Sequence, residues 1–150
     1  MAALPLATAA QPDLLPPERA FEFSARAVDA RTLEARFTVA GGYYLYRDKL
    51  KFSVEPGAIA GNPRLPPGKI KVDEFFGKVE IYRGLVVVSV PLGKAAPGRS
   101  VVLHAESQGC ADVGVCYPPQ VQQITLALPA RPGPPGELIE AAPLRKSWFN

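Results

Sequence analysis

The chain has 150 residues, 47% of them hydrophobic, so it can bury the core of one compact domain without a metal or disulfide to make it fold. Seventeen Lys and Arg against fourteen Asp and Glu leave a net charge of +3 without a long run of like charge, which argues against a nucleic-acid-binding protein. No stretch reaches the roughly 18–20 apolar residues of a membrane-spanning helix, so none is expected in this chain.

The first residues resemble the end of an export signal. Met1 to Gln11 reads MAALPLATAAQ, which is small and apolar, and Ala7 to Ala9 resembles a signal-peptidase site. We interpret residues 1–18 as the remnant of a cleaved signal, with a flexible alanine-rich tail as the alternative. In both cases the folded domain is expected to begin near residue 19.

Short runs that alternate apolar and polar residues follow, and this period of two is typical of half-buried β-strands. About seven strands are expected, at 21–28, 33–39, 42–51, 79–83, 85–90, 100–106 and 121–128. Glycines and prolines separate these runs, and the prolines would interrupt most helices longer than two turns. The pattern predicts an all-β domain built as an antiparallel β-sandwich. A closed barrel is the alternative, because strand spacing does not decide whether a sheet closes.

The composition changes after Leu128. Residues 129–143 are rich in proline and glycine, which favours an extended linker, so we assign 19–128 to the domain and 129–150 to a linker. Arg145, Lys146, Trp148 and Phe149 have the basic and aromatic character of chain near a membrane interface. We therefore hypothesise that the native protein continues into a membrane domain.

Cys110 and Cys116 are the only two cysteines, and five residues separate them. A static disulfide that braces a hairpin is one interpretation. A dithiol that cycles is another, because one thiolate can attack a partner disulfide and the second can resolve the mixed disulfide without leaving the loop. From the residues alone, both interpretations stay open.

His104 is the only histidine. A structural zinc site needs four Cys or His ligands, and the chain offers three, so a metal site is disfavoured. A serine triad is disfavoured too, because His104 lies within a predicted strand and no nucleophile-elbow motif accompanies it. We expect His104 to be a polar strand residue.

Four motifs follow one another along the chain, GYYLYR at 42–47, DEFFG at 73–77, EIYR at 80–83 and GCADVGVCYPP at 109–119. Together they resemble the N-terminal periplasmic domain of the DsbD family of bacterial thiol:disulfide interchange proteins. The resemblance spans about residues 21–128. It implies an immunoglobulin-like sandwich at the periplasmic face of a Gram-negative inner membrane. It also implies a native chain that continues through a membrane domain to a thioredoxin-like domain.

The activity that the resemblance implies is that of a protein-disulfide reductase relay. Such a domain receives reducing equivalents from the thioredoxin-like C-terminal domain of the same protein. It passes them to a periplasmic disulfide isomerase and to a thioredoxin-like protein of cytochrome c maturation. By motif position, Cys116 resembles the cysteine that forms the mixed disulfide, and Cys110 resembles its resolving mate. No bound cofactor or metal is implied.

The resemblance also suggests roles for residues around the cysteines. It makes 73–77 a cap loop in which Phe75 covers the disulfide, whereas we expect Phe76 to anchor the loop. Asp73 and Glu74 either keep the thiols protonated or are solvated loop charges, and Gly77 ends the loop.

The resemblance also places tyrosines beside the cysteine pair. If 42–51 is a strand, Tyr44 and Tyr46 share the face that lines the site, and Tyr43 points the other way. Tyr117, Pro118 and Pro119 are expected to fix the exit from the cysteine loop. The rival to the relay is an exported β-sandwich adaptor that binds proteins through aromatic loops and keeps a purely structural disulfide.

Overall fold

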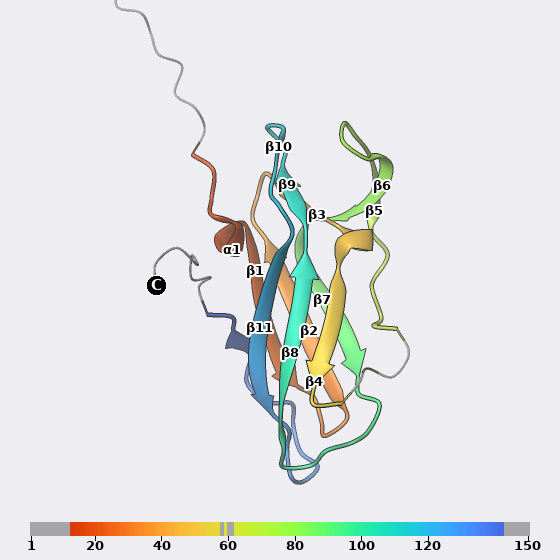
Figure 1. The fold of residues 1–150 in the computed structure, drawn as a ribbon, viewed down its shortest axis with the longest axis vertical. Coiled ribbons are helices and arrows are strands. Elements are labelled where there is room, and N and C mark those ends of the chain that lie inside the picture. The colour runs from red at the N-terminus through yellow and green to blue at the C-terminus, as the bar shows by residue number, and fades with distance from the viewer. Residues whose placement is uncertain (1–12, 58, 60–61, 143–150) are drawn as a thin grey trace, which may run out of the picture.

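The computed structural model describes residues 13–57, 59 and 62–142 and is nearly all β-structure (Figure 1). The elements in chain order are α1 (Pro17–Ala20), β1 (Phe21–Ala27), β2 (Thr32–Val39), β3 (Tyr43–Tyr46), the short 3-10 helix η1 (Arg47–Lys49), β4 (Lys51–Glu55), β5 (Lys69–Asp73), β6 (Gly77–Tyr82), β7 (Gly84–Pro91), β8 (Ser100–Ser107), β9 (Gly109–Ala111), β10 (Val115–Cys116), β11 (Gln120–Ala127) and β12 (Ile139–Glu140).

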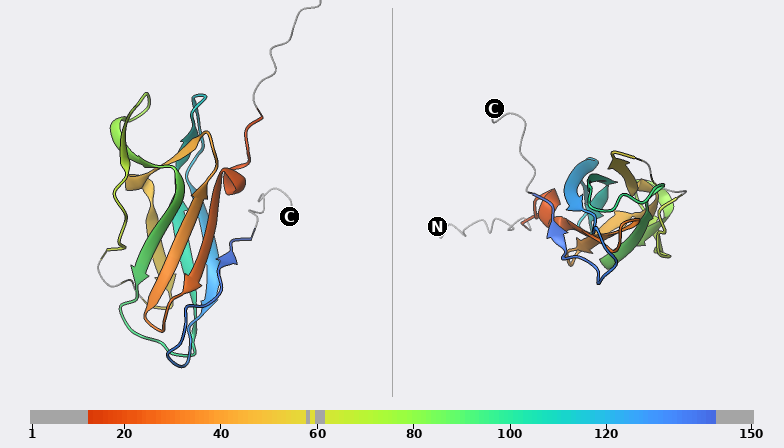
Figure 2. Two further views of the ribbon diagram at one scale, coloured as in Figure 1. Left: turned by 180° about the vertical axis from the view of Figure 1, so that it is seen from behind. Right: turned by 90° about the horizontal axis from the view of Figure 1, so that it is seen from below.

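The strands form three antiparallel sheets. Sheet A has the order β12-β1-β2-β7, sheet B the order β10-β9-β3-β6-β5, and sheet C the order β11-β8-β4. Sheets A and C face each other across the core, as Figures 1 and 2 show from the front, from behind and from below. The predicted immunoglobulin-like β-sandwich is confirmed. All three strand orders are linear, so the described strands form open sheets and not a closed barrel.

Alternation along the strands fills the space between sheets A and C. Phe23 of β1 and Phe37 of β2 stack with their ring centroids 5.1 Å apart, and Leu103 of β8 is fully buried. Burying an apolar side chain of this size stabilises the fold by about 1.5–3 kcal/mol. The polar residues between them face solvent, which explains why a period of two located these strands.

Sheet B carries two hairpins away from this core. The β5–β6 and β9–β10 hairpins project at the same end of the sandwich, the top in Figure 1 and in the left view of Figure 2. Strand β3 lies between β9 and β6 and connects the two hairpins through backbone hydrogen bonds. The cysteines and the predicted cap loop therefore lie at one end of the molecule.

The prediction of a single strand at 42–51 is wrong. Strand β3 ends at Tyr46, η1 turns the chain, and β4 begins at Lys51 in sheet C. The backbone N–H of Leu50 donates to the carbonyl of Arg47 and closes this turn. Sequence alternation missed the change of sheet because all four residues of β3 are buried, on both faces of the strand.

Four further strands were not predicted, β5, β9, β10 and β12. In β5 the apolar residues Ile70 and Val72 are exposed, so the usual relation between apolar pattern and burial is inverted. β10 and β12 have only two residues each, too short for a periodic signal.

The chain on both sides of 19–128 contacts the sandwich. The N–H of Leu15 donates to the Tyr43 hydroxyl, and the Tyr117 hydroxyl donates to the carbonyl of Leu15. After Leu128, Ile139 pairs with Ala25 of β1, so the segment assigned to a linker runs back along sheet A. The predicted signal remnant lies mostly outside the described residues, as do Arg145, Lys146, Trp148 and Phe149.

Across the described ranges, no helix has the length and apolar character to cross a membrane.

Candidate active site

The two cysteines face each other across the β9–β10 hairpin. Cys110 and Cys116 are direct partners in the ladder and form a disulfide. Gly114 makes the turn possible, because its φ of +99° lies in the left-handed region that favours glycine, and its N–H donates to the carbonyl of Ala111. Cys110 is fully buried, whereas Cys116 is half-buried. Cys116 is therefore the more exposed cysteine of the pair.

Gly109 lets the hairpin lie close to β3. A Cβ at this position would lie 2.4 Å from the carbonyl oxygen of Tyr44 and 2.5 Å from the Phe21 ring. Only glycine fits this close approach of two backbones. The glycine before Cys110 thus sets the distance between the disulfide and the tyrosines.

The tyrosines of β3 alternate across sheet B. Tyr44 and Tyr46 pack with Cys110 and Ile81 on the outer face, and Tyr43 lies in the main core on the other face. The Tyr46 hydroxyl lies 3.0 Å from Cys110 Sγ and 3.8 Å from Cys116 Sγ. Tyr46 therefore contacts both sulfurs.

Asp73 is buried beneath this cluster and accepts four hydrogen bonds. The hydroxyls of Tyr44 and Tyr46 donate to Oδ2, and the N–H groups of Phe75 and Phe76 donate to Oδ1 at 2.7 and 2.8 Å. Burial alone would raise the pKa of Asp73, but these donors outweigh it and lower the pKa below the ordinary 3.8. Asp73 is thus a buried carboxylate and not a solvated loop charge.

The pKa values of the two tyrosines shift in the opposite direction, upwards. Burial, together with the hydrogen bond to the negative Asp73, raises the pKa of Tyr44 to about 12. The same causes raise the pKa of Tyr46 further. Both hydroxyls are therefore protonated at neutral pH and available as donors to the carboxylate.

The cap loop contacts the site through Phe76. The Phe76 ring stands edge-on to Tyr46 with 5.0 Å between centroids, while among the ring pairs of the described residues Phe75 takes part in none. Phe75 is 52% exposed, and Glu74 is exposed beside Gly114 of the cysteine hairpin. Gly77 has a φ of +75° and ends the loop. The roles of Phe75 as a lid and of Phe76 as an anchor both stay predictions.

An ion pair that sequence reasoning did not assign links the turn of the cysteine hairpin to the residue after β6. The Arg83 guanidinium donates two hydrogen bonds to Asp112, at 3.0 and 2.9 Å, and a third to the carbonyl of Tyr43. The hydrogen bonds to Arg83 lower the pKa of Asp112. Both residues lie in motifs singled out above, but 29 positions separate them and no local pattern pairs them.

The comparisons with known proteins agree with this geometry. The family model for the N-terminal region of the thiol:disulfide interchange protein DsbD matches residues 11–128. The chain belongs to the DsbD N-terminal domain family. It is 45% identical over 145 residues to DsbD of Ralstonia nicotianae, which covers 95% of this chain and 24% of that protein. It is 42% identical over 134 residues to DsbD 2 of Pseudomonas aeruginosa, covering 88% and 22%. The chain thus spans about a quarter of the length of these curated relatives.

Solved structures of the DsbD N-terminal domain are similar as well. The reduced domain from Neisseria meningitidis aligns with a TM-score of 0.73 and 36% identity, over 86% of this chain and 96% of that one. A complex between the DsbD N-terminal and PilB N-terminal domains of the same species aligns with a TM-score of 0.65 and 39% identity, over 75% and 87%.

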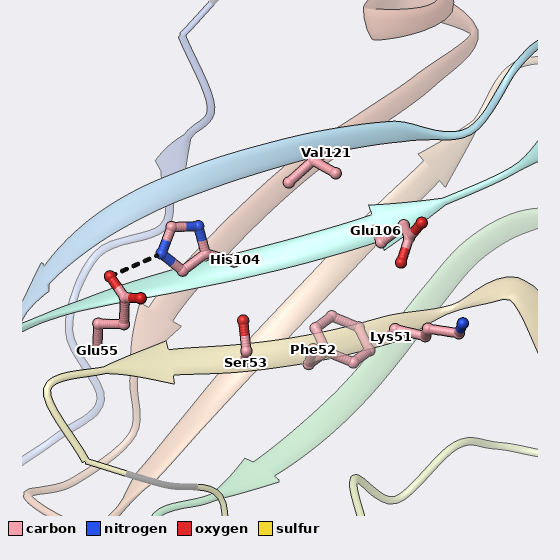
Figure 3. A pocket seen from close by; sticks show the side chains of 7 residues that line it. All are labelled: Lys51, Phe52, Ser53, Glu55, His104, Glu106 and Val121. Carbon is pink, nitrogen blue, oxygen red and sulfur yellow. Dashed lines mark ion pairs between the residues drawn. The ribbon is translucent and has the colours of Figure 1, made fainter.

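His104 takes no part in the disulfide site of this DsbD N-terminal domain. It lies in β8 on sheet C, where Lys51, Ser53 and Glu106 line the same shallow pocket of about 420 Å³ (Figure 3). Its Nε2 lies 3.5 Å from a carboxylate oxygen of Glu55. The structure thus places His104 on a strand away from the cysteines, as expected. Within the part of the chain that the structure describes, no group of three or more His, Cys, Asp or Glu could hold a metal.

Proposed function

We propose that this domain is a thiol–disulfide relay that acts as a protein-disulfide reductase at the periplasmic face of the Gram-negative inner membrane. The observation that carries the proposal is the Cys110–Cys116 disulfide, in which Cys116 is half-buried and the fully buried Cys110 contacts Tyr46. A buried resolving cysteine is protected from outside disulfides, while its partner can be attacked.

The cycle moves two electrons through one disulfide. A thiolate of the reductant attacks Cys116 Sγ, the Cys110–Cys116 bond breaks, and Cys110 leaves as a thiolate that takes up a proton. The second thiol of the reductant then attacks its own bridged sulfur, which leaves the domain as a dithiol and the reductant as a disulfide. In the second half, the Cys116 thiolate attacks the disulfide of the acceptor, and Cys110 resolves the mixed disulfide.

The reductant that we propose is the thioredoxin-like C-terminal domain of the native protein. The acceptors are a periplasmic disulfide isomerase and a thioredoxin-like protein of cytochrome c maturation. The complex of the Neisseria domain with a PilB N-terminal domain supports exchange with separate proteins. The disulfide chemistry itself needs no bound cofactor.

The reduction potential of the Cys110–Cys116 pair tests the relay. The 150-residue chain is equilibrated in thiol/disulfide buffers, and the alkylated thiols are counted by mass. A potential of about −200 to −270 mV, the range of glutaredoxins and thioredoxin, supports exchange. A potential below about −300 mV indicates a structural disulfide and favours the adaptor.

Two cysteine variants separate the roles within the pair. Cys116→Ala should abolish transfer to an oxidised thioredoxin-like protein, because it removes the attacking thiolate. Cys110→Ala should instead accumulate the mixed disulfide, which mass spectrometry detects. An adaptor would keep partner binding in both variants and would form no mixed disulfide.

A further inference from the structure

Cationic side chains lie on the aromatic rings that surround the disulfide. The Lys49 ammonium lies 5.1 Å from the centroid of the Phe76 ring. The Lys71 ammonium lies 5.3 Å from the centroid of the Tyr44 ring, and the Arg83 guanidinium lies 5.4 Å from the same ring. Distances of this size are typical of cation–π contacts. The contacts hold the charged ends of flexible side chains beside the site.

The two lysines differ from Arg83 in their charge balance. Asp112 forms an ion pair with Arg83 and attracts Lys71 at longer range, whereas none of the five ion pairs among the described residues includes Lys49 or Lys71. Asp73 is buried under four hydrogen bonds. The charges left at this end are therefore mostly positive.

Other exposed charges nearby do not reverse this balance. Lys69 and Lys78 of the β5–β6 hairpin also lack an ion pair among the described residues. The acids Asp112 and Glu80 are paired with Arg83 and Arg47, and the exposed acids outside these ion pairs are Glu74 and Asp48. Four lysines against the carboxylates of Asp48, Glu74 and buried Asp73 leave one net positive charge at this end, and all four lysines lie outside the described ion pairs.

Apolar side chains occupy the same end of the molecule. Phe75 and Phe76 are 52% and 48% exposed on the cap loop, and Val113 and Val115 are 61% and 40% exposed on the cysteine hairpin. An apolar centre with a charged rim is the usual arrangement of a protein-docking surface. The charge on the rim then selects among partners and speeds encounter with the complementary ones.

We propose that Lys49 and Lys71 select partners whose disulfide is flanked by carboxylates. This inference rests on the proposed function, because it concerns the protein that docks at the same disulfide. The ammonium groups contact Asp or Glu side chains next to the partner's cysteines while Cys116 approaches the partner's sulfur. The partner is thus a protein with an acidic surface around its reactive disulfide.

Small disulfides of opposite charge test the selection. The reduced 150-residue chain is mixed with glutathione disulfide, which is anionic, or with cystamine, which is cationic. Samples are quenched by alkylation at intervals, and the alkylated thiols of the domain are counted by mass. In each reaction the domain dithiol becomes a disulfide and the probe becomes two thiols, so the electrons balance. The quantity of interest is the ratio of the two rate constants, compared between variants.

The double variant Lys49→Gln/Lys71→Gln should lower the ratio of glutathione disulfide to cystamine about tenfold at low salt, since each lysine contributes an attraction to one probe and a repulsion to the other. The effect should largely disappear in about 1 M sodium chloride, where the Debye length is about 3 Å. Lys49→Arg/Lys71→Arg keeps both charges and should keep the ratio. Lys94→Gln is the matched control, because Lys94 lies in the connection between β7 and β8 and lines a separate pocket.

The outcomes distinguish this inference from the proposed function. If neither probe oxidises the wild-type dithiol, the relay itself fails. If both probes react but the ratio is unchanged in the glutamine double variant, the selection by Lys49 and Lys71 is wrong. An equal fall of the ratio in Lys94→Gln would also overturn it, because net charge alone would then explain the preference. Circular dichroism and a thermal transition on each variant exclude misfolding.

Discussion

The hydroxyl oxygen of Tyr46 lies 3.0 Å from Cys110 Sγ, and the same hydroxyl donates its proton to buried Asp73. A tyrosine has only one hydroxyl proton. Because Tyr46 uses that proton in its hydrogen bond to Asp73, its oxygen can only accept a hydrogen bond from Cys110. In the reduced domain the Cys110 S–H is then the donor to Tyr46. This chain of hydrogen bonds favours the neutral thiol of Cys110 over the thiolate.

Asp73→Asn should make Cys110 more reactive, because it removes the negative charge at the end of this chain. In a Cys116→Ala background, iodoacetamide should alkylate Cys110 about threefold to tenfold faster at neutral pH, and the pKa of Cys110 from the pH profile should fall. Asp48→Asn, on exposed η1, is the matched control. An unchanged pH profile would show that Asp73 does not act on the thiol.

The stability contribution of Asp73 should depend on pH. Its pKa in the folded protein lies below the ordinary 3.8, so the contribution is present above that value and is lost as the pH falls through the folded pKa. Asp73→Asn should lower the free energy of unfolding by about 2–4 kcal/mol at neutral pH, and the difference should shrink as the pH is lowered from neutral through the ordinary 3.8 and below. Urea unfolding across this pH range measures it. A difference that is constant with pH would contradict the ionised, hydrogen-bonded carboxylate.

Gly109→Ala should destabilise the domain by about 1–3 kcal/mol, because the new methyl group meets the Tyr44 carbonyl and the Phe21 ring at distances that a Cβ does not tolerate. Gly41→Ala is the control, since a Cβ there meets no atom within 4 Å. Chemical denaturation of both variants measures the difference. Equal stabilities would mean that the hairpin moves away from β3 at little cost.

The two phenylalanines of the cap loop should differ in effect. If Phe75 is the lid, Phe75→Ala should speed the reaction of the reduced domain with a small neutral disulfide several-fold. It should change the free energy of unfolding little, because Phe75 is 52% exposed. Phe76→Ala should lower the free energy of unfolding by about 1 kcal/mol, because it loses the edge-on contact with Tyr46. Stopped-flow kinetics and urea unfolding test the two variants. Unchanged rates for Phe75→Ala with several oxidants would contradict the role of Phe75 as a lid.

Arg83 and Asp112 should show a small coupling. Their side chains are 39% and 43% exposed, so a double-mutant cycle with Arg83→Gln and Asp112→Asn should give about 0.5–1 kcal/mol in low salt and less in high salt. Arg83→Lys should recover only part of it, because lysine cannot donate the two parallel hydrogen bonds. A coupling of zero would mean that the ion pair does not brace the cysteine hairpin.

The sequence alone determined most of the sandwich strands, namely β1, β2, β7, β8 and β11, and the cysteine loop. Strands such as β2 and β8 bury every second residue, and that alternation is a local property of the chain. Spacing identified Cys110 and Cys116 as a possible pair, and the motif resemblance added their family. Neither required knowledge of the contacts between distant segments.

Only the tertiary structure decided how the site is assembled. Tyr46 meets Asp73 across 27 positions and Cys110 across 64, and Arg83 meets Asp112 across 29. These contacts depend on the order of β9, β3, β6 and β5 in sheet B, where two strands are too short or too inverted in pattern to be seen in the sequence. Burial then changed the character of Asp73 from a loop charge to the acceptor of four hydrogen bonds, because the strand order encloses its carboxylate between the tyrosines and the cap-loop backbone.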